Sequence, residues 1–348
     1  MTRALFFLAL LPFLSPRAFA AEPMKVGLAE MDITPDYPIR LHGFGFRREE
    51  SEGVRQKVSA KALVIIDDKT GPAVLITVDN LGIPKAIRAE VAKRLASPMK
   101  LRPERLTITA THTHCAPMLE GVAPTIFGTD IPEPHRAHIA TYTREFTSKL
   151  VEVALGAFRN AQPATLEWVR GKAGFAKNRR TAGGPVDHDL PMLLVYGPDH
   201  SLRGVWFSYA CHCTTLSDNL IDADWAGYAK AAIQAEHPGV IALASIGCGA
   251  DANPEGRDGP DKVGVAKAHG QAIARNLTFT TSRPISALLE ISSVDLRLPF
   301  DAARTRAEWE ERAKKPGAVG YHAGVNLARL DRGETLPDGI DYSVQTWR

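Results

Sequence analysis

Residues 61–79 read KALVIIDDKTGPAVLITVD, two apolar runs that each end in an aspartate. The runs at 61–67 and 73–79 are continuously apolar rather than alternating, which is typical of strands buried on both faces. Residues 68–71 supply the polar residues and the glycine of a turn between them. This stretch therefore predicts two neighbouring strands in the interior of a sheet.

Helical and strand-like patterns alternate through the rest of the chain. Apolar residues recur every three or four positions, as in amphipathic helices, over 84–98, 139–157, 224–237, 263–277, 304–315 and 323–330. Short β-branched runs occupy 106–110, 164–169, 192–196, 205–213, 241–246, 285–298 and 340–347. The alternation predicts the α/β class, with mixed β-sheets flanked by α-helices.

The first residues read as a processing signal. Arg3 precedes an apolar stretch from residue 4 to residue 14, and a small-x-small sequence follows at 18–20. A signal peptide over 1–20 is predicted, with export to the periplasm or to the outside of the cell after cleavage. The apolar stretch is shorter than the ~20 residues that a membrane helix needs.

The mature chain is predicted to form one catalytic domain, residues 21–348. No internal repeat or linker divides it. The last apolar run, 340–347, reads as a strand that has just begun, whereas chain ends are normally exposed and frayed. We therefore expect the domain to be incomplete at its C-terminus.

Composition narrows the class of partner. The chain is 45% hydrophobic and 23% charged, close to the average for globular domains. Its net charge of +3 over 348 residues is small, and no long block of lysine and arginine is present. A surface that follows a phosphate backbone is therefore not expected, and no nucleic acid is predicted as a partner.

The strongest chemical signal is a set of histidines. Thr111-His112-Thr113-His114 follows the strand predicted at 106–110, and His212 stands near the end of the run at 205–213. Two side chains that are two residues apart on extended backbone point to the same side. Strand ends that deliver imidazoles to one edge of a sheet make a metal pocket.

Several motifs around these histidines resemble the neutral, non-lysosomal ceramidase family. The closest matches are the threonine-histidine repeat at 111–114 and Gly227-Tyr228-Ala229. Looser matches, spread over nearly all of the mature chain, are GLAEMDITP at 27–35, LHGF at 41–44, DNLG at 79–82, NRR at 178–180 and SDN at 217–219. The resemblance implies zinc-dependent hydrolysis of the amide bond of an N-acyl lipid, from ceramide to sphingoid base and fatty acid.

The resemblance also assigns roles. It makes His112 and His212 zinc ligands and places His114 in the pocket, where it orients substrate or moves a proton. The family's remaining ligands, a glutamate and a tyrosine, have no convincing counterpart before Arg348. Asn253 stands where many members carry a serine, so a hydroxyl nucleophile is not available there. A zinc-activated water is the nucleophile that we expect instead.

Four other side chains are candidates for supporting roles. Asp79 and Asp251 follow predicted strands and can accept the free ring N–H of a metal-bound histidine. The alternative for each is an ordinary turn or cap aspartate. Arg179 can bind the polar head of the substrate or the oxyanion, and Asn253 can donate its amide to the oxyanion. Asn253 before proline is also simple turn chemistry.

The cysteines leave two interpretations open. They lie in or next to the same motifs, yet four are too few for a disulfide scaffold of this size. They are either small buried hydrophobes, which the absence of a C-x2-C spacing favours, or part of a Cys/His zinc site. The sequence does not decide whether any of them pair; the four are Cys115, Cys211, Cys213 and Cys248.

The substrate class follows from the resemblance, and alternatives remain beside it. A lipid-like amide substrate would bring the protein into peripheral contact with membranes or lipid aggregates. The segment 115–134, directly after the histidine pair, is rich in proline and predicts a long loop. Its apolar residues either contact an acyl chain or pack onto the domain: Met118, Leu119, Val122, Ile126 and Phe127. The competing functions are another exported metal-dependent amidase or esterase and a non-catalytic binding module. An amidohydrolase barrel is disfavoured because it needs eight similar βα units.

Overall fold

A computed structural model describes residues 24–279, 281–285 and 289–348 of the protein. The predicted signal peptide, 1–20, lies outside the described residues. Among the helices that the structure describes, none has the length and apolar character to cross a membrane. The extent of the predicted domain, 21–348, stays a prediction.

A nine-stranded mixed sheet forms the centre of the molecule. Its main path runs in the order β4-β3-β2-β1-β5-β7-β8-β9. The strands are β1 (Met24–Asp32), β2 (Ser59–Asp67), β3 (Gly71–Val78), β4 (Leu106–Ala110), β5 (Gln162–Lys172), β7 (Asp189–Tyr196), β8 (Leu202–Tyr209), β9 (Ile241–Ile246) and, beside β5, β11 (Arg283–Pro284). Neighbours β3/β4 and β8/β9 are parallel and the other pairs are antiparallel. The hairpin expected at 61–79 is confirmed as β2 and β3.

The sheet folds back on itself, so that its two halves enclose an apolar layer. Val26 and Leu63 of one half and Val195 and Leu243 of the other share this buried cluster. A hydrogen bond of 2.7 Å between the hydroxyls of Thr109 in β4 and Ser245 in β9 also joins the halves. These strands are buried on both faces, which explains why their sequences are continuously apolar.

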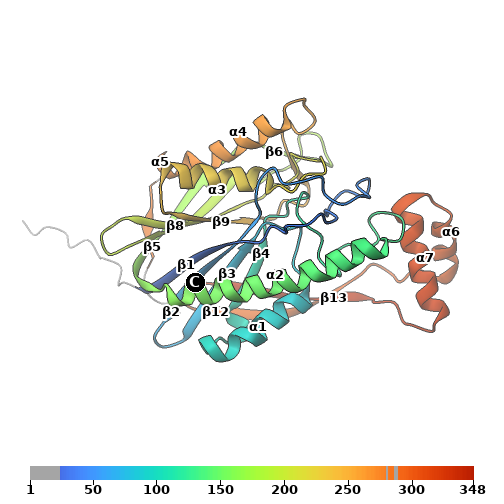
Figure 1. The fold of residues 1–348 in the computed structure, drawn as a ribbon, viewed down its shortest axis with the longest axis horizontal. Helices are drawn as coiled ribbons and strands as arrows, with labels where there is room; N and C mark the ends of the chain where they lie inside the picture. Colours follow the sequence, from blue (N-terminus) through green and yellow to red (C-terminus); the bar gives the residue numbers. More distant parts are fainter. Residues whose placement is uncertain (1–23, 280, 286–288) are drawn as a thin grey trace, which may run out of the picture.

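Helices cover both outer faces of the folded sheet (Figure 1). α1 (Lys85–Met99) and α2 (Glu133–Arg159) pack on the β1–β4 half. α3 (Asp224–Glu236) and α4 (Lys262–Ala274) pack on the other half. The predicted class, mixed β-sheets flanked by α-helices, is confirmed.

The long helix α2 shows how the sequence pattern becomes packing. Ile139, Tyr142, Phe146, Leu150 and Val153 are spaced by three or four residues and are all at most 4% exposed. They form one stripe that faces the sheet. Each fully buried side chain of this size contributes about 1.5–3 kcal/mol from the hydrophobic effect.

Short elements complete the chain. They are η1 (Pro103–Arg105), β6 (Ala176–Asn178), β10 (Ala252–Pro254), α5 (Asn276–Phe279), β12 (Ile291–Pro299), α6 (Arg306–Ala313), α7 (Gly317–Asp331) and β13 (Gly339–Trp347). β12 and β13 pair as a two-stranded ribbon, with α6 and α7 at its far end in Figure 1. The strand predicted at 285–298 is described as β12 from Ile291 onward, and residues 286–288 of that prediction lie outside the described residues.

The Pro-rich loop after the histidine pair is part of the core. Met118, Leu119 and Phe127 are 0–2% exposed and belong to the cluster beneath α1 and α2, and Val122 and Ile126 pack against it. Of the two alternatives for these residues, packing onto the domain is confirmed.

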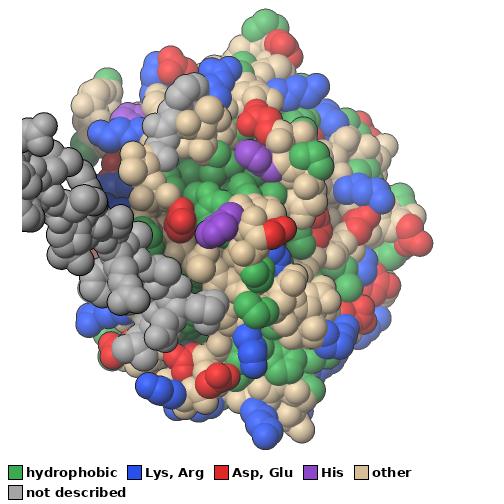
Figure 2. All heavy atoms as spheres, turned by 90° about the vertical axis from the view of Figure 1, so that its left-hand side faces the viewer, with side chains coloured by type: hydrophobic (Ala, Val, Ile, Leu, Met, Phe, Trp, Pro, Cys, Tyr) green, Lys and Arg blue, Asp and Glu red, His purple; other side chains and the backbone are tan. Residues whose placement is uncertain are grey.

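On the face seen in Figure 2, basic and acidic side chains are interspersed rather than gathered by sign.

Candidate metal centre

Three histidines from distant parts of the chain converge on one point. One ring nitrogen from each of His112, His114 and His212 lies within 4.8 Å of the other two. The ring centroids are 4.8 Å apart for His112 and His212 and 5.0 Å apart for His112 and His114. In the part of the chain that the structure describes, this is the group of side chains that has the geometry to hold a metal ion.

The backbone brings His112 into the site by a route that differs from the expected one. β4 ends at Ala110, and His112 has a φ of +60°, in the left-handed region. The expectation of an extended backbone carrying both imidazoles is therefore wrong. Non-glycine residues rarely adopt positive φ, and such strain concentrates at functional sites. His212 likewise lies beyond its strand, since β8 ends at Tyr209.

Backbone carbonyls fix the orientation of two of the rings. Nδ1 of His112 is 2.7 Å from the carbonyl oxygen of Leu81, and Nδ1 of His212 is 2.8 Å from that of Gly249. A ring that donates from Nδ1 keeps the lone pair of Nε2 free for a metal. Both rings are thus held in the tautomer that a metal ligand requires.

The two aspartates that were expected to accept from the histidine rings, Asp79 and Asp251, bind other side chains. Both carboxylate oxygens of Asp79 lie 2.6 Å from Nζ of Lys230, and the carboxylate of Asp251 accepts from the amide of Asn178 at 3.3 Å. Carbonyls take the place that the carboxylates were expected to fill. The expected contact of Asp79 and Asp251 with the histidine rings is therefore corrected.

The spacing of the nitrogens fits a small tetrahedral ion. Nε2 of His112 and Nε2 of His114 are 3.4 Å apart. Two nitrogens bound tetrahedrally at a zinc–nitrogen length of about 2.1 Å would be separated by about 3.4 Å. His114 nevertheless differs from the other two histidines, because its buried Nδ1 has no hydrogen-bond partner among the described residues.

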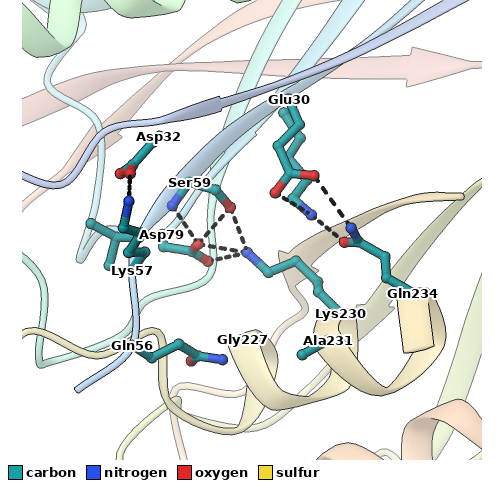
Figure 3. Close-up of a pocket in the computed structure, with 12 residues that line it drawn as sticks. Glu30, Asp32, Gln56, Lys57, Ser59, Asp79, Gly227, Lys230, Ala231 and Gln234 are labelled. Carbon is teal, nitrogen blue, oxygen red and sulfur yellow. Dashed lines mark hydrogen bonds and ion pairs between the residues drawn. The ribbon is translucent and has the colours of Figure 1, made fainter. Parts of the chain in front are cut away.

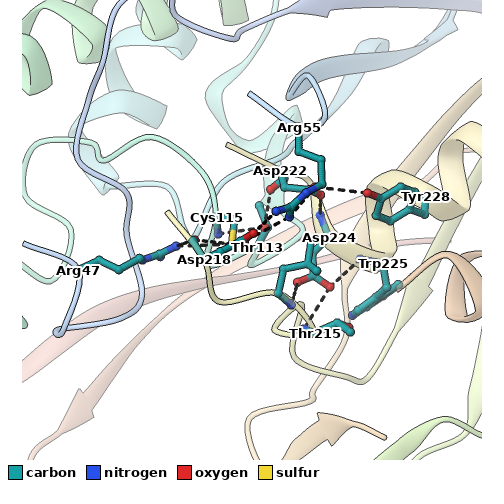
Figure 4. Close-up of polar contacts among 11 residues, drawn as sticks. Arg47, Arg55, Thr113, Cys115, Thr215, Asp218, Asp222, Asp224, Trp225 and Tyr228 are labelled. Atoms are coloured by element: carbon teal, nitrogen blue, oxygen red, sulfur yellow. Dashed lines mark hydrogen bonds and ion pairs between the residues drawn. The ribbon is translucent and has the colours of Figure 1, made fainter. Parts of the chain in front are cut away.

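A turn before β2 holds His114 in place. The Phe44 ring lies 4.9 Å from the His114 ring, and the backbone of Gly43 lies so close that a Cβ there would be 2.3 Å from it. The Arg47 guanidinium donates to the carbonyls of His42 and His114 and, at 2.7 Å, to that of Asp218. Figure 4 shows this arginine reaching toward Asp218.

Burial keeps the three imidazoles neutral. Desolvation lowers the pKa of His112 and of His212, and the positive charge of Arg179 lowers both further. Desolvation, followed by the charges of His112 and His212, lowers the pKa of His114 to about 2. Neutral imidazole is the form that binds a metal ion, so the protein environment favours ligation.

The Asn-Arg motif and the segment around Asn253 meet beside His212. β6 and β10 pair, with Lys177 opposite Asn253, and the carbonyl of Ala252 accepts from the backbone N–H of His212 at 2.9 Å. Arg179 is exposed and donates to the carbonyl of Ala250 at 3.0 Å. Sequence reasoning did not predict this pairing, which brings Arg179 and Asn253 to one side of the site.

Three of the four cysteines are small buried hydrophobes, the simpler of the two interpretations. All four are free, with Cys115, Cys211 and Cys213 buried and Cys248 exposed. Burial raises the pKa of the Cys115 thiol to about 12 and that of Cys213 well above its usual value. Protonated buried thiols are poor metal ligands, and the metal-capable group contains no cysteine.

Comparisons with known proteins point to one family. Residues 24–128 match the family model for neutral/alkaline non-lysosomal ceramidase, N-terminal. The chain is 24% identical over 246 residues to the neutral ceramidase of Drosophila pseudoobscura pseudoobscura and 23% identical over 228 residues to that of Drosophila melanogaster. The alignments cover 66% and 61% of this chain but 35% and 32% of the relatives, so the match spans about a third of their length.

Solved structures show the same fold. The neutral ceramidase from Pseudomonas aeruginosa superposes with a TM-score of 0.71 at 16% identity, over 94% of this chain and 61% of that one. A ceramidase complexed with C2 gives a TM-score of 0.66 at 18% identity, over 85% of this chain and 49% of that one. At these identities the likeness establishes the architecture.

Proposed function

We propose that the chain is a member of the neutral/alkaline ceramidase family, whose N-terminal model matches residues 24–128, and that it hydrolyses the amide bond of an N-acyl lipid with the help of zinc. The products from a ceramide would be a sphingoid base and a fatty acid. The observation that carries the proposal is the convergence of His112, His114 and His212 on one point. Export after removal of residues 1–20 belongs to the same proposal, and the N-terminal sequence of the secreted protein tests it.

Two of the histidines are suited to hold the ion. His112 and His212 would bind it through Nε2, because their Nδ1 atoms are committed to the carbonyls of Leu81 and Gly249. When bound, zinc lowers the pKa of water toward ~7 and polarises an amide carbonyl. Catalytic zinc sites usually have three protein ligands, so a further ligand beside these two is part of the proposal.

The remaining groups would position the substrate. His114 would orient the substrate beside the ion, because its Nε2 lies 3.4 Å from that of His112 and its low pKa makes it a poor proton acceptor. Arg179 and Asn253 belong to the β6/β10 segment beside His212. Either can donate to the oxygen that gains negative charge during the reaction.

Removal of the metal tests the proposal directly. We expect the purified protein, with the further ligand that the proposal requires, to bind zinc and to release a free sphingoid base from a fluorogenic N-acyl-sphingosine. A chelator should abolish the release and zinc should restore it, whereas magnesium, which prefers oxygen ligands, should not. The matched ester of the same lipid serves as the comparison. Cleavage of the ester alone would make the protein an esterase, and activity that survives complete metal removal would refute the zinc mechanism.

The turn that holds His114 gives a second test. Replacement of Gly43 with alanine would force a Cβ against the His114 ring at a φ of +89°, where side chains are strained. We expect the displaced ring to lower kcat by about 100-fold, the scale of a 1 Å misplacement. Gly82→Ala is the control, because nothing lies within 4 Å of a Cβ there. Equal kinetics of the two variants would show that the position of His114 does not matter.

A further inference from the structure

A second polar cavity lies between α3 and the strands β1 and β2 (Figure 3). Its volume is about 340 Å³, near the lower end of the ~300–1,000 Å³ that ligand pockets occupy. The described lining contains none of the three histidines. Its buried wall carries Lys61 from β2, Lys230 from α3 and Asp79 from the end of β3.

The fully buried carboxylate of this wall, that of Asp79, already forms an ion pair with Lys230. Asp79 is 0% exposed, and both of its oxygens lie 2.6 Å from Nζ of Lys230, which is 5% exposed. The hydroxyl and the backbone N–H of Ser59 also donate to Asp79, at 2.9 and 2.8 Å. Lys230 and Asp79 therefore neutralise each other.

Lys61 lacks an equivalent buried partner. It is only 2% exposed, and the carboxylate that faces it at 3.0 Å belongs to Glu30, whose side chain is 37% exposed. Solvent weakens an ion pair with such an exposed carboxylate. Desolvation, and then the charge of Lys230, lower the pKa of Lys61 to about 8. The buried wall of the cavity thus carries one excess positive charge.

Glu30 shows how a carboxylate sits in the cavity. One of its oxygens accepts from Nζ of Lys61, and the other accepts from the side-chain amide of Gln234 at 3.4 Å. The carbonyl of Gln234 in turn accepts from Lys61 at 2.6 Å. Lys61 and the Gln234 amide are therefore a preformed pair of donors that matches the two oxygens of a carboxylate.

We propose that this cavity binds a small carboxylate, which displaces the side chain of Glu30 and occupies its place on Lys61 and Gln234. The incoming carboxylate takes over the pairing with Lys61 from Glu30, so the charge of the buried wall stays balanced. The displaced Glu30 loses little, because it stands on the rim and becomes hydrated. The site is separate from the histidine cluster, and its test measures binding rather than hydrolysis.

The probe is ¹³C-labelled acetate, and its binding to the full-length protein is measured by the broadening of its ¹³C resonance. Chloride at the same ionic strength is the reference anion. We expect saturable binding that chloride does not displace. Glu30→Gln removes the competing charge and should tighten acetate binding by about fivefold. Lys61→Gln should weaken it by at least about tenfold. Lys93→Gln, on α1 outside the lining of the cavity and with a side chain 80% exposed, should leave it unchanged.

The gain expected for Glu30→Gln protects the test against simple misfolding, since a damaged protein would not bind more tightly. Acetate bound at the histidine cluster contributes equally to all four proteins, so only the differences between them count. Equal binding by all four proteins would overturn the proposal. Weaker binding by Glu30→Gln, or displacement of acetate by chloride, would overturn it as well.

Discussion

Replacement of His112 with alanine is expected to remove the metal and the amide hydrolysis together. Its Nε2 faces that of His114 at 3.4 Å, and its Nδ1 is fixed by the carbonyl of Leu81. Loss of an outer partner of a metal ligand costs about 10–100-fold in affinity or activity, so loss of the ligand itself should cost at least about 100-fold. Zinc content and the rate of sphingoid-base release check both effects in the same sample.

Two further variants separate ligation from backbone strain. His112 has a φ of +60°, which asparagine tolerates better than alanine does. His112→Asn should therefore fold at least as well as His112→Ala and still fail to bind zinc. His237→Ala, at the end of α3, is the control and should keep both zinc and activity. Undiminished zinc affinity in His112→Ala would show that the metal binds elsewhere.

Replacement of Lys230 with methionine is expected to have the largest effect on stability. The variant leaves Asp79 buried and without its cation, and breaking a buried ion pair in this way costs about 3–5 kcal/mol. Denaturant unfolding measures the loss. Asp79 precedes Leu81, whose carbonyl orients His112, so the same variant should also weaken metal binding.

A double variant that removes both charges of the buried pair, and a variant of an exposed ion pair, are the controls for the effect of burial. Asp79→Asn combined with Lys230→Met removes both charges and should recover a large part of the lost stability. Lys57 and Asp32 form a pair of similar length, 2.8 Å, on the rim of the same cavity, with side chains 77% and 43% exposed. Lys57→Met should leave stability nearly unchanged, because solvent screens this exposed pair. Equal losses for Lys57→Met and Lys230→Met would contradict the role given to burial.

The regular elements were predictable because their signals are local. The continuous apolar run at 61–67 became β2, and the stripe from Ile139 to Val153 became the buried face of α2. β4 and β9 begin and end at the residues that the β-branched runs predicted. Periodicity and turn residues within a few positions determine such elements, so no knowledge of distant contacts was needed.

Whether a feature of the site could be predicted from the sequence depended on how far apart in the chain the contacting residues are. The sequence identified His112, His114 and His212 as the important imidazoles, and the structure brings them together. It assigned the supporting acceptors to Asp79 and Asp251, where the structure has carbonyls. Every residue has a backbone carbonyl, so the sequence cannot indicate which carbonyl will accept the N–H of a histidine ring. The turn Leu41-His42-Gly43-Phe44 was noticed as a motif, yet nothing local showed that its glycine packs against His114.

By itself, the sequence determined the α/β class, the approximate positions of the longer helices and of many strands, and the three histidines, because side-chain pattern and residue chemistry are properties of short segments. Only the tertiary structure decided how the sheet folds over and that His112 leaves its strand with a positive φ. It also decided that Lys230 rather than a histidine pairs with Asp79, and that Lys61 faces an exposed carboxylate. These outcomes depend on burial and on contacts between distant segments, which arise only when the whole chain packs.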